Sequence, residues 1–289
     1  LTGADMHSGT GPDDSASRIE LAIRTLQVGA LAYPFFRNHA GQSDGYFLPT
    51  NVSGLSVPPL ARAAITLRYN LLPHLYSLFA EVSRRGGTVV TPLSFEFPTA
   101  DVRNVSTQFM LGGLMVCPVL SGMLPDGASI SQDTDAANSA TRGNGVPSAE
   151  VECVFPQRRA AEDVRWFDWH TLDLLRVRTR TAVVTAPIDT LPVFLLSGNV
   201  VATQLIGNAL TSVAARLRPF QLTVALCPDG SASGSMLLDD GESLDDVMSE
   251  LLFNASSPSP SSIHFSSAVL SKGYTPPASA TLDTVRVLL

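Results

Sequence analysis

Lysine is almost absent from this sequence, which contains a single one, Lys272. Lysine and arginine together number 19 against 26 aspartates and glutamates, which gives a formal net charge of −7. Proteins that bind nucleic acid need a clustered positive surface to contact phosphates, so we expect no nucleic-acid partner. Hydrophobic residues make up 45% of the 289 positions and charged residues 16%, which excludes a wholly disordered chain.

Cysteine is also scarce: Cys117, Cys153 and Cys227 are the only three, and they lie far apart. No CxxC pair and no Cys/His spacing of a zinc site occurs. We therefore expect no metal site and no cofactor. One disulfide is possible, but the spacing does not select its two cysteines.

Long uninterrupted apolar runs are missing as well. Residues 104–125 carry no charge, but Gly112, Gly113, Pro118 and Gly122 interrupt them. A helix that spans a membrane needs about 20 mostly apolar residues in succession. The segment therefore predicts two buried strands and no membrane span.

The first 88 residues alternate strand and helix signals. Residues 1–5 and 32–39 are short segments with a polar end, as strands often have. Between them, Ser17 and Glu20 have the spacing of a capping box, and Gly29 is expected to end that helix. A second helix is predicted where apolar residues recur every three or four positions up to Val82, with a kink at Pro73. Strand–helix–strand–helix is typical of a parallel α/β layer.

After about Thr88 the pattern changes to short strand candidates bounded by proline, glycine and aspartate. These candidates include residues 88–90, 94–97, 114–120, 151–155, 164–167 and 220–226. Residues 126–149 have almost no large apolar side chain, which predicts a solvated loop. Residues 254–262 are rich in serine and proline and are expected to form a loose surface loop.

Three polar residues follow the first two predicted strands. Asp5 ends the first, while Arg37 and His39 lie two apart on the second and would project from one face. In α/β folds, sites form at the carboxyl ends of strands. A guanidinium beside an imidazole suits a hydroxyl-rich or anionic ligand. The alternative is a structural Asp–Arg ion pair with a capping histidine, and spacing alone favours that alternative.

Other candidate residues give weaker signals. His74 lies beside Pro73 in the second helix and is expected to be a packing residue. The acidic turn Asp239-Asp240-Gly241-Glu242 lacks the spaced ligands of a calcium loop and predicts a tight hairpin instead. No nucleophile elbow, P-loop or pair of catalytic carboxylates stands out by its sequence context.

Six segments, in order, give the chain a resemblance to glycoside hydrolase family 31, the α-glucosidase family. They cover nearly the whole chain: Gly3-Ala4-Asp5; Gln27 to Ala30 with Tyr33 to His39; Leu67-Arg68-Tyr69 through Leu72-Pro73 to Tyr76; Thr91-Pro92-Leu93 through Phe97-Pro98; Pro187-Ile188-Asp189-Thr190-Leu191-Pro192-Val193; and Leu238 to Ser243. Each segment is similar to a motif of that family, and the shared order carries the resemblance.

The resemblance implies an α/β plus all-β architecture, in which the C-terminal end of a (β/α)8 barrel precedes two β-sandwich domains. Residues 1–88 would form the last two β/α units, residues 89–205 a proximal sandwich, and residues 206–289 part of a distal one. In the family, the residues that match Asp5, Arg37 and His39 bind the hydroxyls of the terminal glucosyl unit. The resemblance thus assigns these three residues to substrate binding.

The resemblance also implies a retaining exo-α-glucosidase that hydrolyses terminal α-linked glucose. Members of the family carry the nucleophile and acid/base aspartates before the segment that Gly3-Ala4-Asp5 matches. Neither is in this chain, so it would need the N-terminal part of its barrel as a partner and be inactive alone. The loop after Asp5, with Met6 and His7, departs from the family pattern. This departure leaves open a non-catalytic carbohydrate-binding or scaffold protein.

Members of this family work in the endoplasmic reticulum, in lysosomes or outside the cell, which implies the secretory pathway. Three Asn-x-Ser triplets, at Asn51, Asn104 and Asn254, would permit N-glycosylation there.

Overall fold

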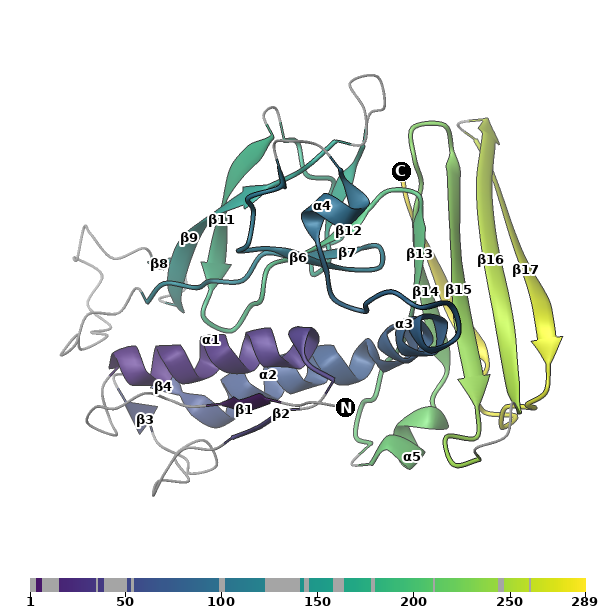
Figure 1. The fold of residues 1–289 in the computed structure, drawn as a ribbon, viewed down its shortest axis with the longest axis horizontal. Helices are drawn as coiled ribbons and strands as arrows, with labels where there is room; N and C mark the ends of the chain where they lie inside the picture. The colour runs from purple at the N-terminus through teal and green to yellow at the C-terminus, as the bar shows by residue number, and fades with distance from the viewer. Residues whose placement is uncertain are drawn as a thin grey trace. The chain divides into compact units, whose positions relative to one another are not determined.

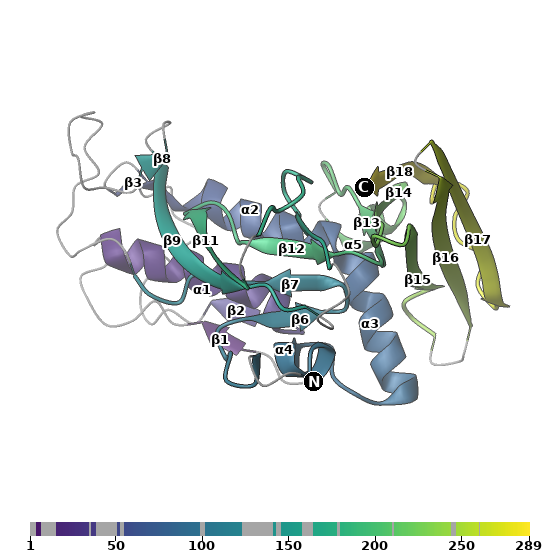
Figure 2. The same ribbon diagram turned by 90° about the horizontal axis from the view of Figure 1, so that it is seen from above.

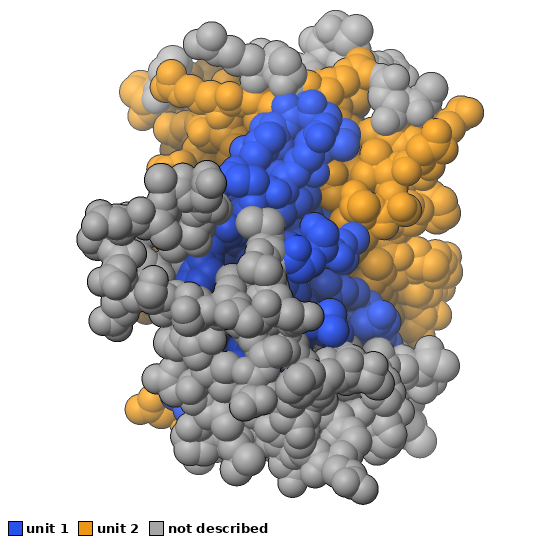
Figure 3. Space-filling view, turned by 90° about the vertical axis from the view of Figure 1, so that its left-hand side faces the viewer, with its two compact units in different colours: residues 1–68, 116–154, 181–192 blue, residues 69–115, 155–180, 193–289 orange. Residues whose placement is uncertain are grey.

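A computed structural model describes residues 4–6, 16–34, 36–38, 51–52, 55–98, 102–122, 141–142, 146–157, 164–177, 180–209, 211–243, 247–259 and 261–289. The chain divides into two compact units (Figure 3). Unit 1 consists of residues 1–68, 116–154 and 181–192, and unit 2 of residues 69–115, 155–180 and 193–289. Each unit is thus assembled from three separate stretches of chain.

Unit 1 begins with a strand, a helix and a parallel strand, as the sequence predicts. Strand β1 (Ala4–Met6) pairs with β2 (Phe36–Asn38), and α1 (Ala16–Ala32) connects them. A two-strand ribbon of β3 (Asn51–Val52) and β4 (Leu55–Ser56) then leads into α2 (Val57–Asn70). Figure 1 labels these elements along the chain. Parallel strands joined by a helix are the repeating element of α/β folds.

Helix α1 is longer than the sequence suggests. The expectation that Gly29 ends it is wrong, because the helix continues to Ala32 and buries both Ala30 and Leu31. A glycine inside a helix costs about 1 kcal/mol relative to alanine, and burial of the apolar side chains that follow offsets that cost.

The predicted second helix is two helices. Pro73 does not merely kink it: α2 ends at Asn70, and α3 (Leu72–Arg85) starts afresh with the proline in its first turn. Proline is favoured there because the first helical N–H groups have no partner within the helix. Leu71, between the two helices, is fully buried.

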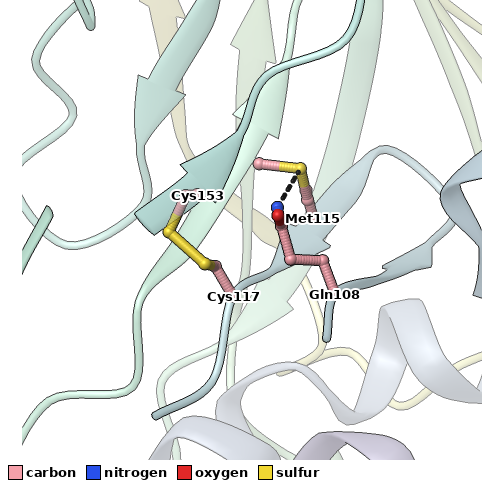
Figure 4. The surroundings of a disulfide bond; sticks show 4 residues. All are labelled: Gln108, Met115, Cys117 and Cys153. Atoms are coloured by element: carbon pink, nitrogen blue, oxygen red, sulfur yellow. Dashed lines mark hydrogen bonds between the residues drawn. A yellow bond between two sulfur atoms is a disulfide. The ribbon is translucent and has the colours of Figure 1, made fainter. Parts of the chain in front are cut away.

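The β-part of unit 1 is a three-stranded sheet in the order β11 (Thr181–Pro187), β9 (Val146–Val154) and β8 (Thr141–Arg142). A disulfide joins Cys117 to Cys153 on β9 (Figure 4). Both cysteines are buried, and Cys227 remains a free thiol. The structure therefore selects the pairing that the sequence left open.

Unit 2 contains two larger sheets. The first has the order β10 (Trp166–Asp168), β12 (Val193–Leu196), β7 (Leu114–Val116), β6 (Phe109–Leu111) and β5 (Thr91–Pro92). The second has the order β17 (Ser262–Lys272), β16 (Met248–Ser259), β15 (Ser231–Asp239), β13 (Asn199–Gln204), β14 (Phe220–Ala225) and β18 (Leu282–Leu288). Short helices α4 (Leu93–Glu96) and α5 (Ser212–Arg216) complete the unit.

The uncharged segment 104–125 contains the antiparallel hairpin β6–β7, which confirms the prediction of buried strands. Gly112 turns the hairpin at φ 56°, a backbone conformation that favours glycine. No helix among the described residues is both long and apolar enough to cross a membrane.

Several local predictions were wrong for identifiable reasons. Residues 88–90 are not a strand, and residues 94–97 largely form helix α4, because Leu93 and Phe97 are both fully buried at a spacing of four while Phe95 is 70% exposed. Residues 141–142 and 146–149 belong to strands, whereas the rest of the expected loop 126–149 lies outside the described residues. Residues 254–262 contain the ends of β16 and β17, a long hairpin visible in Figures 1 and 2.

The centre of the first sheet in unit 2 is aromatic. Trp166 lies 6.0 Å from Phe97 and 5.9 Å from Phe155, and Phe155 meets Phe194 edge to face at 4.9 Å. All four rings are buried. Aromatic pairs in this geometry contribute about 0.5–1.5 kcal/mol beyond area burial, so this cluster fixes how the strands of this sheet pack.

A buried arginine on α1 holds unit 1 together. The Arg24 guanidinium donates from Nη2 to the carbonyl of Ala186 at 2.9 Å and from Nη1 to that of Pro187 at 3.0 Å. Next to it, Gln27 Nε2 donates to the carbonyl of Ile188 at 2.8 Å. Burial lowers the pKa of Arg24, while the carboxylates of Glu20 and Asp189 oppose that effect. We call this set of contacts the Arg24 clamp.

Unit 2 contains a buried histidine. His74 Nε2 lies 3.0 Å from the carbonyl of Leu111, so the neutral ring donates a proton there. Burial lowers the pKa of His74, and the hydrogen bond to Leu111 offsets this only in part. This confirms that His74 is a packing residue rather than a ligand.

Replacing Arg24 by methionine should lower the free energy of unfolding by about 3 kcal/mol, because buried carbonyls lose their donor while the side-chain volume is kept. Arg24→Lys should lower the free energy of unfolding by less, because the lysine ammonium keeps the positive charge although it lacks the planar donor fork of the guanidinium. Denaturant unfolding measures both. The matched control is Arg85→Met, which removes an exposed pair with Glu81 and a 4.0 Å pair with Glu250 at a cost of about 1 kcal/mol or less, because Glu250 keeps Arg84 as its closer partner. Equal losses at the two positions would contradict the clamp.

The stability of the fold should fall as the pH drops below about 6.5, the ordinary histidine pKa. His74 has a depressed pKa when folded, so protons bind the unfolded chain more readily and destabilise the fold by at most about 1.4 kcal/mol per pH unit. His74→Gln keeps a donor for Leu111 but cannot titrate, so its unfolding midpoint should change less between pH 7 and pH 5. The exposed His170→Asn variant should behave like wild type. Identical pH profiles for the three proteins would rule His74 out as the source.

Candidate functional site

The strand pair β1–β2 carries two of the three residues that the sequence assigns to a site. The strands run parallel, and their register places Asp5 directly opposite Arg37. Neighbouring strands lie about 4.8 Å apart, so the two backbone positions are adjacent. Their side chains, and the whole of His39, lie outside the described residues. The fold thus brings Asp5 and Arg37 together at backbone level.

The chain order explains this adjacency. Helix α1 carries the chain from the end of β1 back to the start of β2, so both strands end at the same edge of their sheet. Sites in (β/α) folds form at this edge because successive loops leave from it. Asp5 and Arg37 are each one residue from the last residue of their strands.

Arg68, a residue to which the sequence analysis gave no role, braces the approach to β2. Its guanidinium donates from Nη1 to the carbonyls of Ala30 at 2.7 Å and Tyr33 at 2.9 Å, and from Nη2 to that of Pro34. These carbonyls belong to the last turn of α1 and to the segment that leads into Arg37. The only signal in the sequence was its place in the segment Leu67-Arg68-Tyr69.

The Arg24 clamp makes two of the six resemblance segments meet. Gln27 belongs to the second segment, and its acceptor Ile188 belongs to the fifth. Ile188 also packs with Ile19, Ile23 and Val57 in one buried cluster. The clamp therefore fixes α1, the helix that connects the strand of Asp5 to the strand of Arg37.

The acidic turn after β15 is structured by its own backbone. Asp240 Oδ1 accepts from the amides of Glu242 and Ser243, both at 2.9 Å. Hydrogen bonds from the Ser243 hydroxyl and then from these amides lower the pKa of Asp240 to about 2. The turn lies between the antiparallel strands β15 and β16, which confirms a hairpin, but residues 240–247 separate the two strands, so the expectation of a tight hairpin is wrong.

A tyrosine on α3 contacts the end of β15. The Tyr76 hydroxyl donates to Asp239 Oδ2, and Arg216 Nη2 lies 3.6 Å from the other oxygen of that carboxylate. Burial, and then the hydrogen bond to Asp239, raise the pKa of Tyr76 to about 12. These contacts tie α3 and α5 to the second sheet of unit 2.

Among the described residues, no three His, Cys, Asp or Glu side chains gather to hold a metal ion.

Two of the three glycosylation candidates have exposed side chains. Asn104 lies in a turn, and Asn254 lies on β16 with its side chain outward. The side chain of Asn51 lies outside the described residues.

Comparison with known proteins adds independent evidence. The model of the glycosyl hydrolase family 31 TIM-barrel domain matches residues 3–78, and that of the family's C-terminal domain matches residues 86–201. The alpha-glucosidase of Aspergillus niger is 33% identical over 84% of this chain, and the lysosomal alpha-glucosidase of Bos taurus is 34% identical over 84%. The chain spans 22% and 24% of the length of these two relatives.

Solved structures show the same fold. A family 31 dextranase of Flavobacterium johnsoniae complexed with glucose superposes with a TM-score of 0.69 at 21% identity, over 92% of this chain and 29% of that one. The glucosidase II alpha subunit superposes with a TM-score of 0.63 at 23% identity, over 88% of this chain and 25% of that one.

The fold is therefore the end of a barrel followed by a β-rich region. Two models of one family match consecutive stretches of the sequence, in the order that the six resemblance segments require. The chain belongs to glycosyl hydrolase family 31.

Proposed function

We propose that this chain is the substrate-orienting and C-terminal portion of a retaining exo-α-glucosidase, which hydrolyses terminal α-linked glucose from oligosaccharides or glycans. The observation that carries the proposal is the register of β1 and β2, which sets Asp5 opposite Arg37 at the edge where such sites form. Alpha-glucosidases among the relatives support the substrate class.

The chemistry of the three residues suits a sugar. Asp5 accepts hydrogen bonds from two adjacent hydroxyls, while Arg37 donates to sugar oxygens from a rigid fork. His39, two residues after Arg37 in the sequence, both donates and accepts when neutral. Together they hold the terminal glucosyl unit while the reacting carboxylates act on its anomeric carbon.

Those carboxylates would come from the preceding part of the barrel. Retaining glycosidases use a nucleophile and an acid/base about 5–5.5 Å apart and pass through a covalent glycosyl intermediate. In the family resemblance both precede the segment of Asp5, and this chain spans less than a quarter of the length of its alpha-glucosidase relatives. The partner required is therefore the N-terminal part of the same barrel.

The proposal divides the chain into residues 1–88 as two β/α units, residues 89–205 as a proximal β-sandwich and residues 206–289 as part of a distal one. Five strands of the six-stranded sheet support the last of these, because they fall between Phe220 and Leu288, whereas β13 (Asn199–Gln204) precedes that boundary. The sandwich domains would buttress the barrel.

We place the protein in the secretory pathway. A buried disulfide between Cys117 and Cys153 supports this, since such bonds persist in oxidising compartments. One relative is a lysosomal alpha-glucosidase, and an ER glucosidase II complex is among the similar structures. Asn51, Asn104 and Asn254 would carry glycans there.

Binding of glucose or maltose to the 289-residue chain should depend on Asp5 and Arg37. Removing a hydrogen bond to a charged group costs about 1.5–3 kcal/mol, so Asp5→Ala and Arg37→Ala should each weaken binding roughly 10- to 100-fold. Isothermal titration measures the dissociation constants. Arg62→Ala, which removes an exposed arginine on α2, is the control and should bind as wild type. Equal binding by all four proteins would remove these residues from the site.

The isolated chain should release no p-nitrophenol from p-nitrophenyl α-glucoside, because the nucleophile and acid/base are supplied by another segment. A colorimetric assay with purified protein measures this, and a complete family member serves as the positive control. Measurable turnover that a carboxylate substitution abolishes would overturn the assignment of catalysis to the preceding segment.

A further inference from the structure

The loop of residues 273–281, between β17 and β18, has an unusual composition. It lies in a stretch, residues 255–282, that contains nine serines, two threonines and four prolines, no aspartate or glutamate, and Lys272 as its one charged residue. In a chain with 26 acidic residues this stretch stands apart. Serine and threonine among prolines are typical of segments that carry O-linked sugars.

Hydrogen bonds at both ends hold this loop in place. At its start, the Ser249 hydroxyl donates to the carbonyl of Tyr274 at 2.6 Å and accepts from its amide at 3.1 Å. At its end, the amide of Phe220 donates to the carbonyl of Thr281 at 2.7 Å. Between them, a turn from Pro277 to Ala280 closes at 2.9 Å, and Ala280 packs against the core of unit 2. The loop is therefore a fixed platform on the surface.

Three threonine or serine hydroxyls of this platform are exposed, those of Thr275, Ser279 and Thr281. Thr281 is the residue that anchors the end of the loop to Phe220, so Thr275 and Ser279 are the two that lie between the anchors. Thr275 and Ser279 are both exposed, and no hydrogen bond joins either hydroxyl to another described residue. Several other serines of this stretch bond within the protein, for example Ser257 to the carbonyl of Ser259 and Ser271 to that of Met248. Pro276 and Pro277 follow Thr275 directly, and proline keeps the backbone extended and removes competing amide donors.

The strand that precedes this loop, β17, has an exposed edge that a bulky group could protect. It is an edge strand of the six-stranded sheet, eleven residues long, with Val269 58% and Leu270 57% exposed. Proteins usually protect such edges with charge, but Lys272, its last residue, is the only charged side chain of β17. A bulky hydrated group on the loop that begins directly after Lys272 would shield the end of this strand.

We propose that Thr275 and Ser279 are acceptors for O-linked N-acetylhexosamine. In this transfer the side-chain oxygen attacks the anomeric carbon of a nucleotide-activated sugar. The new C–O bond replaces the bond to the nucleoside diphosphate, which leaves, and the hydroxyl proton passes to a base of the transferase. The inference rests on the secretory-pathway part of the proposed function. It does not depend on glucose binding, so either can fail alone.

The test incubates the purified, folded 289-residue chain with a polypeptide N-acetylgalactosaminyltransferase and UDP-N-acetylgalactosamine, and follows intact mass. We expect a gain of one or two N-acetylhexosamine masses, located at Thr275 and Ser279 by fragmentation. The double variant Thr275→Ala/Ser279→Ala should lose this gain. Ser266→Ala/Ser267→Ala, which removes two exposed hydroxyls on β17, is the matched control and should retain it.

A free peptide of residues 272–282 shows whether the transferase recognises the sequence. Modification of the peptide but not of the folded chain would show that the platform is inaccessible and would overturn the proposal. Failure with both would show that the segment is not an acceptor. Sugar on Ser266 or Ser267 instead would equally overturn it.

Discussion

The organisation of unit 1 depends on one buried cation. The Arg24 side chain is buried and donates hydrogen bonds to carbonyls more than 160 positions further along the chain. Burial lowers the pKa of its guanidinium. Burying the guanidinium without acceptors would cost several kcal/mol. The folded unit therefore requires the carbonyls of Ala186 and Pro187 to pack against α1. The clamp thereby fixes the helix between β1 and β2, and with it the adjacency of Asp5 and Arg37 on which the proposed sugar site rests.

Much of this arrangement follows from local sequence rules. The parallel pairing of β1 and β2 follows from strand–helix–strand order, and the burial of His74 from its place on an apolar helix face. Spacing alone favoured a structural ion pair for Asp5 and Arg37. The residue types suited a hydroxyl-rich or anionic ligand, and the family resemblance narrowed that ligand to a sugar. The roles of Arg24 and Arg68 could not be predicted, because their acceptors are backbone carbonyls, which every residue possesses and no sequence pattern marks.

Where sequence rules failed, tertiary packing prevailed over local preference. Residues 94–97 look like a strand, yet two buried side chains four apart force a helical turn. Serines and prolines near Ser256 suggest a loop, yet burial of Phe253 and Ala255 on one face keeps β16 extended. The disulfide shows the same limit, since three cysteines allow three pairings and only the fold brings Cys117 to Cys153.

The interleaving of the two units has a consequence for synthesis on the ribosome. At roughly 5–20 residues per second, the acceptors of the Arg24 clamp emerge some 8–32 seconds after the arginine itself. During that interval the Arg24 guanidinium lacks the backbone carbonyls that accept its hydrogen bonds in the folded unit. Unit 1 cannot close until Pro192 has been translated, by which time two of the three stretches of unit 2 already exist. The side chains that unit 1 buries therefore stay exposed for longer than those of a chain whose domains are completed one after the other.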